Sequence, residues 1–142
     1  MDRATVWATA NPNCVSSVSS VFEKVGSGVS GIVLQPIFSS KAASIIDRYP
    51  DGIDYVAGMA LPRTTTGLIF WKTLLEQPDL SGDPLFQKHI AYFTGGRTSL
   101  AWAQEQLAMI ESMRRLSGVH FMPLKNTRDL ISLLQRGDIP NE

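Results

Sequence analysis

The sequence has little cysteine, no excess of charge of one sign and no long apolar run. Its 142 residues include one cysteine, Cys14, which excludes an internal disulfide and a cysteine-rich metal site. Thirteen basic residues balance thirteen acidic ones, so no strong positive field is available for nucleic acid. No apolar stretch reaches eighteen residues, and no apolar leader is evident. We therefore expect a cytoplasmic protein that binds neither nucleic acid nor a membrane.

The composition is that of a folded protein. Hydrophobic residues make up 44% of the chain and charged residues 18%, which argues against intrinsic disorder. The length suits a single domain with its own core. We expect that domain to cover residues 1–136, followed by a short polar tail at 137–142.

Short apolar runs typical of strands alternate with longer segments of helical period. Five such strand–helix units predict an α/β fold, with helices on both faces of a doubly wound, five-stranded parallel sheet. The predicted strands cover residues 5–9, 31–37, 53–61, 89–94 and 119–122. The longest predicted helix covers about 98–116, and Asn126 or Thr127 is expected to cap the last one.

Ligands of such sheets bind at the carboxyl ends of the strands. Hydroxyls, amides and glycines dominate the loops there, and no predicted strand ends in Asp or Glu. Because Mg²⁺ prefers anionic oxygen ligands, we expect no magnesium site. We also expect no other metal and no cofactor.

The third unit carries a specific resemblance. Residues 51–79 read DGIDYVAGMALPRTTTGLIFWKTLLEQPD and follow SSKAASIIDRYP. These segments, the run IAYFT and the last helix resemble the receiver domains of response regulators. The resemblance covers about residues 3–134 and implies a flavodoxin-like (βα)5 fold with strand order 2-1-3-4-5.

Two parts of receiver chemistry are missing at the matching positions. The phosphoacceptor aspartate, four residues before Pro62, is replaced by Gly58. The acidic pair that holds Mg²⁺ falls on Ala8, Thr9 or Ala10. Since aspartyl phosphorylation needs a carboxylate nucleophile and a metal to neutralise charge, we expect no aspartyl phosphate here.

The remaining matches are mixed. Thr94 matches the switch threonine, whereas the receiver lysine falls on Pro123, with Lys125 two residues away. The chain thus resembles the degenerate, pseudo-receiver branch of the family. Its expected degenerate pocket comprises Ala8, Thr9, Gly58, Thr94 and Lys125.

The same resemblance implies a partner face built from the fourth helix, fifth strand and fifth helix. The predicted helix at 98–116 also carries a second apolar line beside the stripe that a core requires. The residues expected at this contact are Trp102, Met109, Met113, Arg114 and Phe121. We expect a signalling module that is not an enzyme and that binds a protein partner or a second copy without phosphorylation.

A flavodoxin-like domain or small enzyme that binds a nucleotide or phosphorylated ligand is the alternative. Arg63 and Thr64 precede one predicted helix, and Gly95, Gly96 and Arg97 precede another, as in anion sites. The glycine spacing matches neither a P-loop nor a dinucleotide fingerprint, and turns and caps use the same residue types.

Three further residues receive structural roles. Cys14 lies near a helix N-terminus but has no cationic neighbour in sequence, so we expect an inert thiol. His89 and His120 have no partners at metal-ligand spacing and are expected to be structural.

Overall fold

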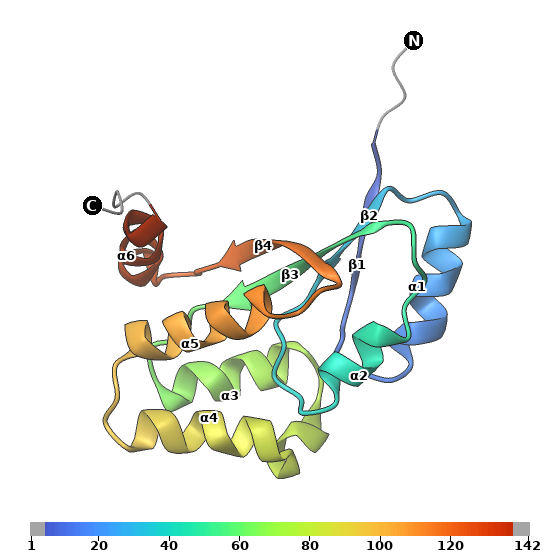
Figure 1. Cartoon of the computed structure of the whole chain (residues 1–142). Coiled ribbons are helices and arrows are strands. Elements are labelled where there is room, and N and C mark those ends of the chain that lie inside the picture. Colours follow the sequence, from blue (N-terminus) through green and yellow to red (C-terminus); the bar gives the residue numbers. More distant parts are fainter. Residues whose placement is uncertain (1–4, 138–142) are drawn as a thin grey trace.

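A computed structural model describes residues 5–137 and shows an α/β fold with one parallel sheet (Figure 1). Its strands lie in the order β1-β2-β3-β4. They are β1 (Trp7–Ala10), β2 (Gly31–Leu34), β3 (Asp54–Ala60) and β4 (Leu116–Met122). The α-helices are α1 (Ser17–Gly26), α2 (Ala42–Asp47), α3 (Thr65–Leu74), α4 (Pro84–Thr94), α5 (Ser99–Glu111) and α6 (Thr127–Gly137), and η1 (Pro78–Gly82) is a 3-10 helix. Within the described residues, no helix is long and apolar enough to cross a membrane.

The prediction of an α/β fold with a parallel sheet is confirmed, but its strand number and order are wrong. Four strands in sequential order replace the expected five in the order 2-1-3-4-5. Connections between parallel strands are right-handed in nearly all proteins, so strands that follow one another across a sheet send every connecting helix to the same side. A doubly wound sheet needs an order that reverses, and this order does not. Figure 1 shows α1 and α2 beside one half of the sheet and α3, α4 and α5 below the other half.

The segment expected to be the fourth strand, residues 89–94, is the second half of α4. Its β-branched and aromatic residues favour a strand, but Asp83 and Pro84 begin a helix. The Asp83 carboxylate accepts hydrogen bonds from two backbone N–H groups of the first turn. Pro84 occupies the first helical position, where its missing N–H costs nothing. Thr94 therefore ends a helix and not a strand.

The core lies between the sheet and the helices. Ile32, Leu34 and Tyr55 pack with α1 and α2 in one cluster. Ala57 and Met59 pack with α3, α4 and α5 in a second cluster. Tyr55, Ala57 and Met59 alternate along β3 and therefore point to the same side, so both groups of helices cover one face of the sheet.

Helix α6 is fixed at its start by a buried polar cluster. The Asn126 side chain accepts a hydrogen bond from the Asp129 N–H at 3.3 Å and donates to the Leu61 carbonyl at 2.9 Å. Asp129 also accepts from the Ser99 hydroxyl at 2.5 Å, which ties α6 to the start of α5. Of the two caps that the sequence allows, Asn126 and Thr127, the structure has Asn126. Apart from Gly137, the tail expected at 137–142 lies outside the described residues.

Candidate functional site

The residues of the expected degenerate pocket do not share one strand edge. Ala8 and Thr9 lie on β1 and Gly58 on β3, with β2 between them, whereas the receiver order places the first strand beside the third. Thr94 lies at the end of α4, and its hydroxyl donates to a carbonyl of its own helix at 2.8 Å. Lys125 is exposed in the loop after β4. The placement of Thr94 at a strand end is therefore wrong.

Gly58 leaves no room for a side chain. A Cβ built there would overlap the Leu34 carbonyl oxygen and would lie 2.8 Å from the Met122 methyl carbon. A carboxylate at this position would need the backbone of β2 or β3 to move. The close packing around Gly58 therefore excludes an aspartate at this position.

The two expected anion loops lie at the same end of the molecule, where α3 and α5 begin and α4 ends (Figure 1). The five residues are Arg63, Thr64, Gly95, Gly96 and Arg97. Thr64 caps α3, because its hydroxyl oxygen accepts from the Gly67 N–H at 3.2 Å. The Arg97 guanidinium lies 4.7 Å from the centre of the Tyr92 ring and 3.9 Å from a Glu105 oxygen. Thr64 thus caps a helix, and Arg97 contacts two side chains of its own chain, Tyr92 and Glu105.

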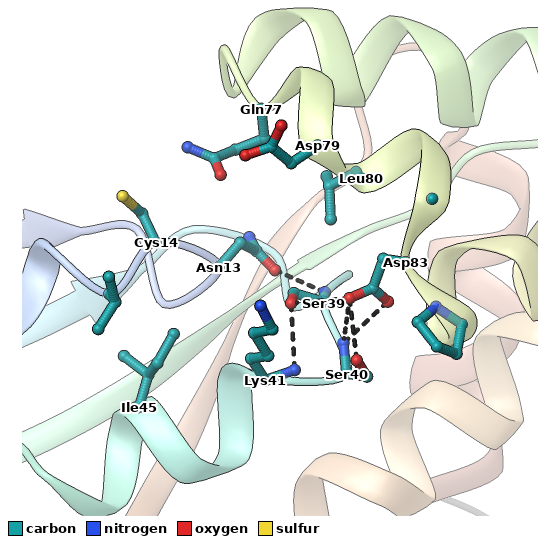
Figure 2. Close-up of a pocket in the computed structure, with 13 residues that line it drawn as sticks. Asn13, Cys14, Ser39, Ser40, Lys41, Ile45, Gln77, Asp79, Leu80 and Asp83 are labelled. Carbon is teal, nitrogen blue, oxygen red and sulfur yellow. Dashed lines mark hydrogen bonds between the residues drawn. The ribbon is translucent and has the colours of Figure 1, made fainter.

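A pocket of about 500 Å³ lies elsewhere on the carboxyl edge, between the loops after β1 and β2 and the helix η1 (Figure 2). The polar residues that line it are Asn13, Cys14, Ser39, Ser40, Lys41, Gln77, Asp79 and Asp83. Its size is within the range of small-molecule sites. The sequence placed the alternative ligand site after the third and fourth predicted strands, so this pocket was missed.

Asn13 joins two walls of the pocket. Its side-chain oxygen accepts from the N–H groups of Phe38 and Ser39, at 2.7 and 2.8 Å. Its amide nitrogen donates to the Pro36 carbonyl at 2.7 Å. Since these contacts are buried and satisfy the amide, Asn13 holds the loop after β1 against the loop after β2.

Asp83 fixes a third wall. Its carboxylate accepts from the Ser40 N–H at 2.9 Å and from the hydroxyls of Ser39 and Ser40, as well as from the start of α4 (Figure 2). Burial raises the pKa of Asp83, but the hydrogen bonds from Ser40, Phe86 and Ser39 outweigh it, so that the pKa is lowered overall. The carboxylate is therefore held ionised as a clamp between two loops.

Cys14 lies in the pocket wall as a partly buried thiol. Its sulfur is 2.9 Å from the Ser16 hydroxyl oxygen. That hydrogen bond lowers the pKa of Cys14, against the opposing effect of burial, and Gln77 contributes in the same direction. Figure 2 shows Lys41 pointing into the same space. The prediction of an inert thiol considered only cationic neighbours and left out the hydrogen bond with Ser16, two residues further along the chain.

The expected partner face is largely occupied by the core. Trp102 is 2% exposed, and its indole N–H donates to Nδ1 of His89 at 3.1 Å. Met109, Met113 and Phe121 are half-buried against the core clusters, and Arg114 is exposed. The placement of Trp102 at a surface contact is therefore wrong.

His89 has the structural environment that the sequence predicts. Its ring packs edge-on against Phe38 and Trp102. Burial lowers the pKa of His89 to about 4, so the imidazole is neutral at pH 7. Within residues 5–137, its Nε2 atom has no hydrogen-bond partner.

The side of the sheet opposite the helices is a second candidate site, which we call the open face. Strand residues alternate between two sides, so the neighbours of the core residues point away from the helices. The open face comprises Trp7, Thr9, Gly31, Val33, Asp54, Val56, Gly58, Gly118 and His120. Ala60 and Met122 follow on the same side but belong to the core cluster of Ala57 and Met59. Trp7, Val33 and Val56 belong to neither core cluster, and Trp7 is 42% exposed.

Comparison with known proteins gives no family: no protein-family model matches the chain, and neither does any curated protein. The open face and the carboxyl-edge pocket are thus the two features that bear on function.

Proposed function

We propose that the chain is a protein-interaction module that binds through the open face of its sheet, without phosphorylation and without a cofactor. The observation that carries the proposal is a parallel sheet whose connecting helices pack on one face, while Trp7, Val33 and Val56 of the other face lie outside both core clusters of the described residues. Parallel sheets are otherwise found with both faces covered, because their strands are apolar on both sides. The uncovered face therefore needs a partner.

The chemistry of the open face supports a protein partner. Among its described residues Asp54, at the amino end of β3, is the charged one, whereas a face built for water would carry polar side chains along its length. Val33 and Val56 lie side by side at paired positions of β2 and β3. Trp7 lies at the margin of the same face and covers Gly31, where a Cβ would overlap the indole ring. An apolar centre with an aromatic residue beside it is typical of protein interfaces.

The proposal moves the interface expected from the sequence to another surface. Trp102 is buried, so the contact is assigned to residues of the open face instead. The regulatory role that the receiver resemblance implies would be exercised through this association. Gly58, which packs against the backbone of β2, offers no carboxylate for a phosphoryl group.

The test compares the native mass of the wild-type chain with that of variants, each in an extract of the cells that make the protein. Thr9 and His120 are exposed in the single chain, so the double variant Thr9→Glu/His120→Glu should fold while placing charge on the open face. We expect the wild-type chain in a species heavier than one chain and the variant at the mass of one chain. Thr73→Glu, at an exposed position of α3, is the matched control and should behave as wild type. Equal masses for the double variant and the wild type would contradict the proposal.

Ligand binding in the carboxyl-edge pocket is a second candidate, favoured by its volume and by the Cys14 thiol. A nucleotide or phosphorylated ligand that binds there should raise the melting temperature with increasing concentration. Lys41→Ala should remove that shift. A melting temperature unchanged across a panel of such ligands would exclude this candidate.

A further inference from the structure

We infer that the partner on the open face is a second copy of this chain, and that the two four-stranded sheets close into one eight-stranded parallel barrel. This inference rests on the proposed function and names its partner. It comes from three features of the described residues: the free edges of the sheet, the number of strands, and the side chains of the open face.

The first feature is the pair of sheet edges. In the order β1-β2-β3-β4, the described strands leave one side of β1 and one side of β4 without a strand partner. A partner that only covered the open face would leave both edges unpaired, whereas a second copy supplies a β1 for each β4. All eight strands then run parallel about a twofold axis, which is the commonest symmetry of protein dimers.

The second feature is the number of strands that two copies supply to a closed barrel. Each copy supplies four strands, and a barrel of eight has an interior that side chains can fill. A sequential order with every helix on one side is also the arrangement of one part of a closed (βα)8 barrel, where helices form the outer ring. In a closed barrel of two copies, α1 to α5 would lie in that outer ring.

The third feature is the composition of the open face, which would become the barrel interior. Large side chains alternate with glycines: Trp7 covers Gly31, and the Met122 methyl lies beside Gly58. Gly118 lies beside Val56, whose methyl would be 3.8 Å from a Cβ at that position. Two copies would place these large and small residues opposite one another. The exposed Asp54, at the amino end of β3, would lie at the rim.

Sedimentation equilibrium of the purified chain tests the inference. We expect the mass of two chains, falling to one on dilution, and the same behaviour for Thr73→Glu. In the barrel, Thr9→Glu/His120→Glu would bury four carboxylates, so association should weaken by about a hundredfold or more while the circular dichroism of the single chain is kept. A wild type with the mass of one chain at every concentration would overturn the inference, and so would a double variant that dimerises as tightly as the wild type.

Hydrogen exchange of the wild type gives a second readout that needs no variant. Backbone amides of β1 and β4 should gain protection as the chain concentration rises, whereas those of α1 should not change. Unchanged exchange in both strands alongside a two-chain mass would show that the dimer uses another surface.

Failure of this inference is distinguishable from failure of the proposed function. A purified monomer whose native complex is broken by Thr9→Glu/His120→Glu keeps the open face as an interface and excludes the second copy. A native complex that survives the double variant excludes both.

Discussion

The two faces of the sheet are built from the same strands but have opposite environments. Ile32 and Leu34 of β2 are completely buried under helices, whereas Val33 between them contributes to neither core cluster. The β2 residues that point to either face are nevertheless apolar or glycine. Sequence alternation in a parallel strand therefore does not tell which face its own chain covers.

This difference separates residues that hold the fold from residues that we propose form an interface. On the covered side even polar groups are buried: the indole N–H of Trp102 donates to Nδ1 of His89, whose Nε2 atom has no partner among the described residues. On the open face, His120 and Thr9 are exposed, and Gly118 lies beside Val56. Substitutions on the two faces should thus affect different quantities: the free energy of unfolding on one, and association on the other.

The largest expected difference is between two neighbours on β2. Ile32→Ala removes a fully buried side chain and should lower the free energy of unfolding by about 2–5 kcal/mol. Val33→Ala should cost less than about 1 kcal/mol when measured at concentrations where the single chain predominates. Urea unfolding of both variants gives the comparison. Equal losses would mean that the chain covers both faces itself.

The second prediction concerns the covered face: protonation of His89 should make the free energy of unfolding depend on pH. In the unfolded chain this imidazole takes up a proton below its ordinary pKa of 6.5, but in the folded chain only near pH 4. The contribution to stability is therefore complete above pH 6.5 and declines as the pH falls from 6.5 to 4, by about 3 kcal/mol at most. His89→Gln keeps an acceptor for Trp102 and should flatten the decline. An identical decline in this variant would assign it to other groups.

A smaller contrast lies within the open face, between two glycines on adjacent strands. Gly58→Ala forces a methyl group onto the Leu34 carbonyl and should cost about 1–3 kcal/mol. Gly118→Ala meets its nearest atom at 3.8 Å and should change stability by less than about 0.5 kcal/mol. Chemical denaturation of the two variants measures the difference. A tolerated alanine at 58 would contradict the close approach of β2 and β3.

Much of the secondary structure was accessible from the sequence because its signals were local. Predictions for four strands are confirmed within a few residues, and so is the cap of the last helix at Asn126. The error at 89–94 arose because apolar β-forming residues were given more weight than Asp83 and Pro84, a strong helix start. Strand order could not be derived locally, because it depends on which strands pair across long connections.

The candidate site was less accessible. The carboxyl-edge pocket is assembled from two loops and η1, and its clamps, Asn13 and Asp83, act on residues more than twenty positions away. The open face could not be predicted for another reason: a strand that is apolar on both sides has the same sequence pattern whether helices of its own chain cover one of its faces or both. Only the sequential strand order distinguishes the two cases.

The central claim, that a protein surface covers the open face, is tested most directly by the fluorescence of Trp7. Trp71 and Trp102 are buried, so iodide in solution should quench mainly Trp7. The account predicts strong quenching at low chain concentration and protection of Trp7 as the chain associates, with Thr9→Glu/His120→Glu remaining quenchable throughout. Quenching of the wild type that stays constant while its mass doubles would contradict the claim.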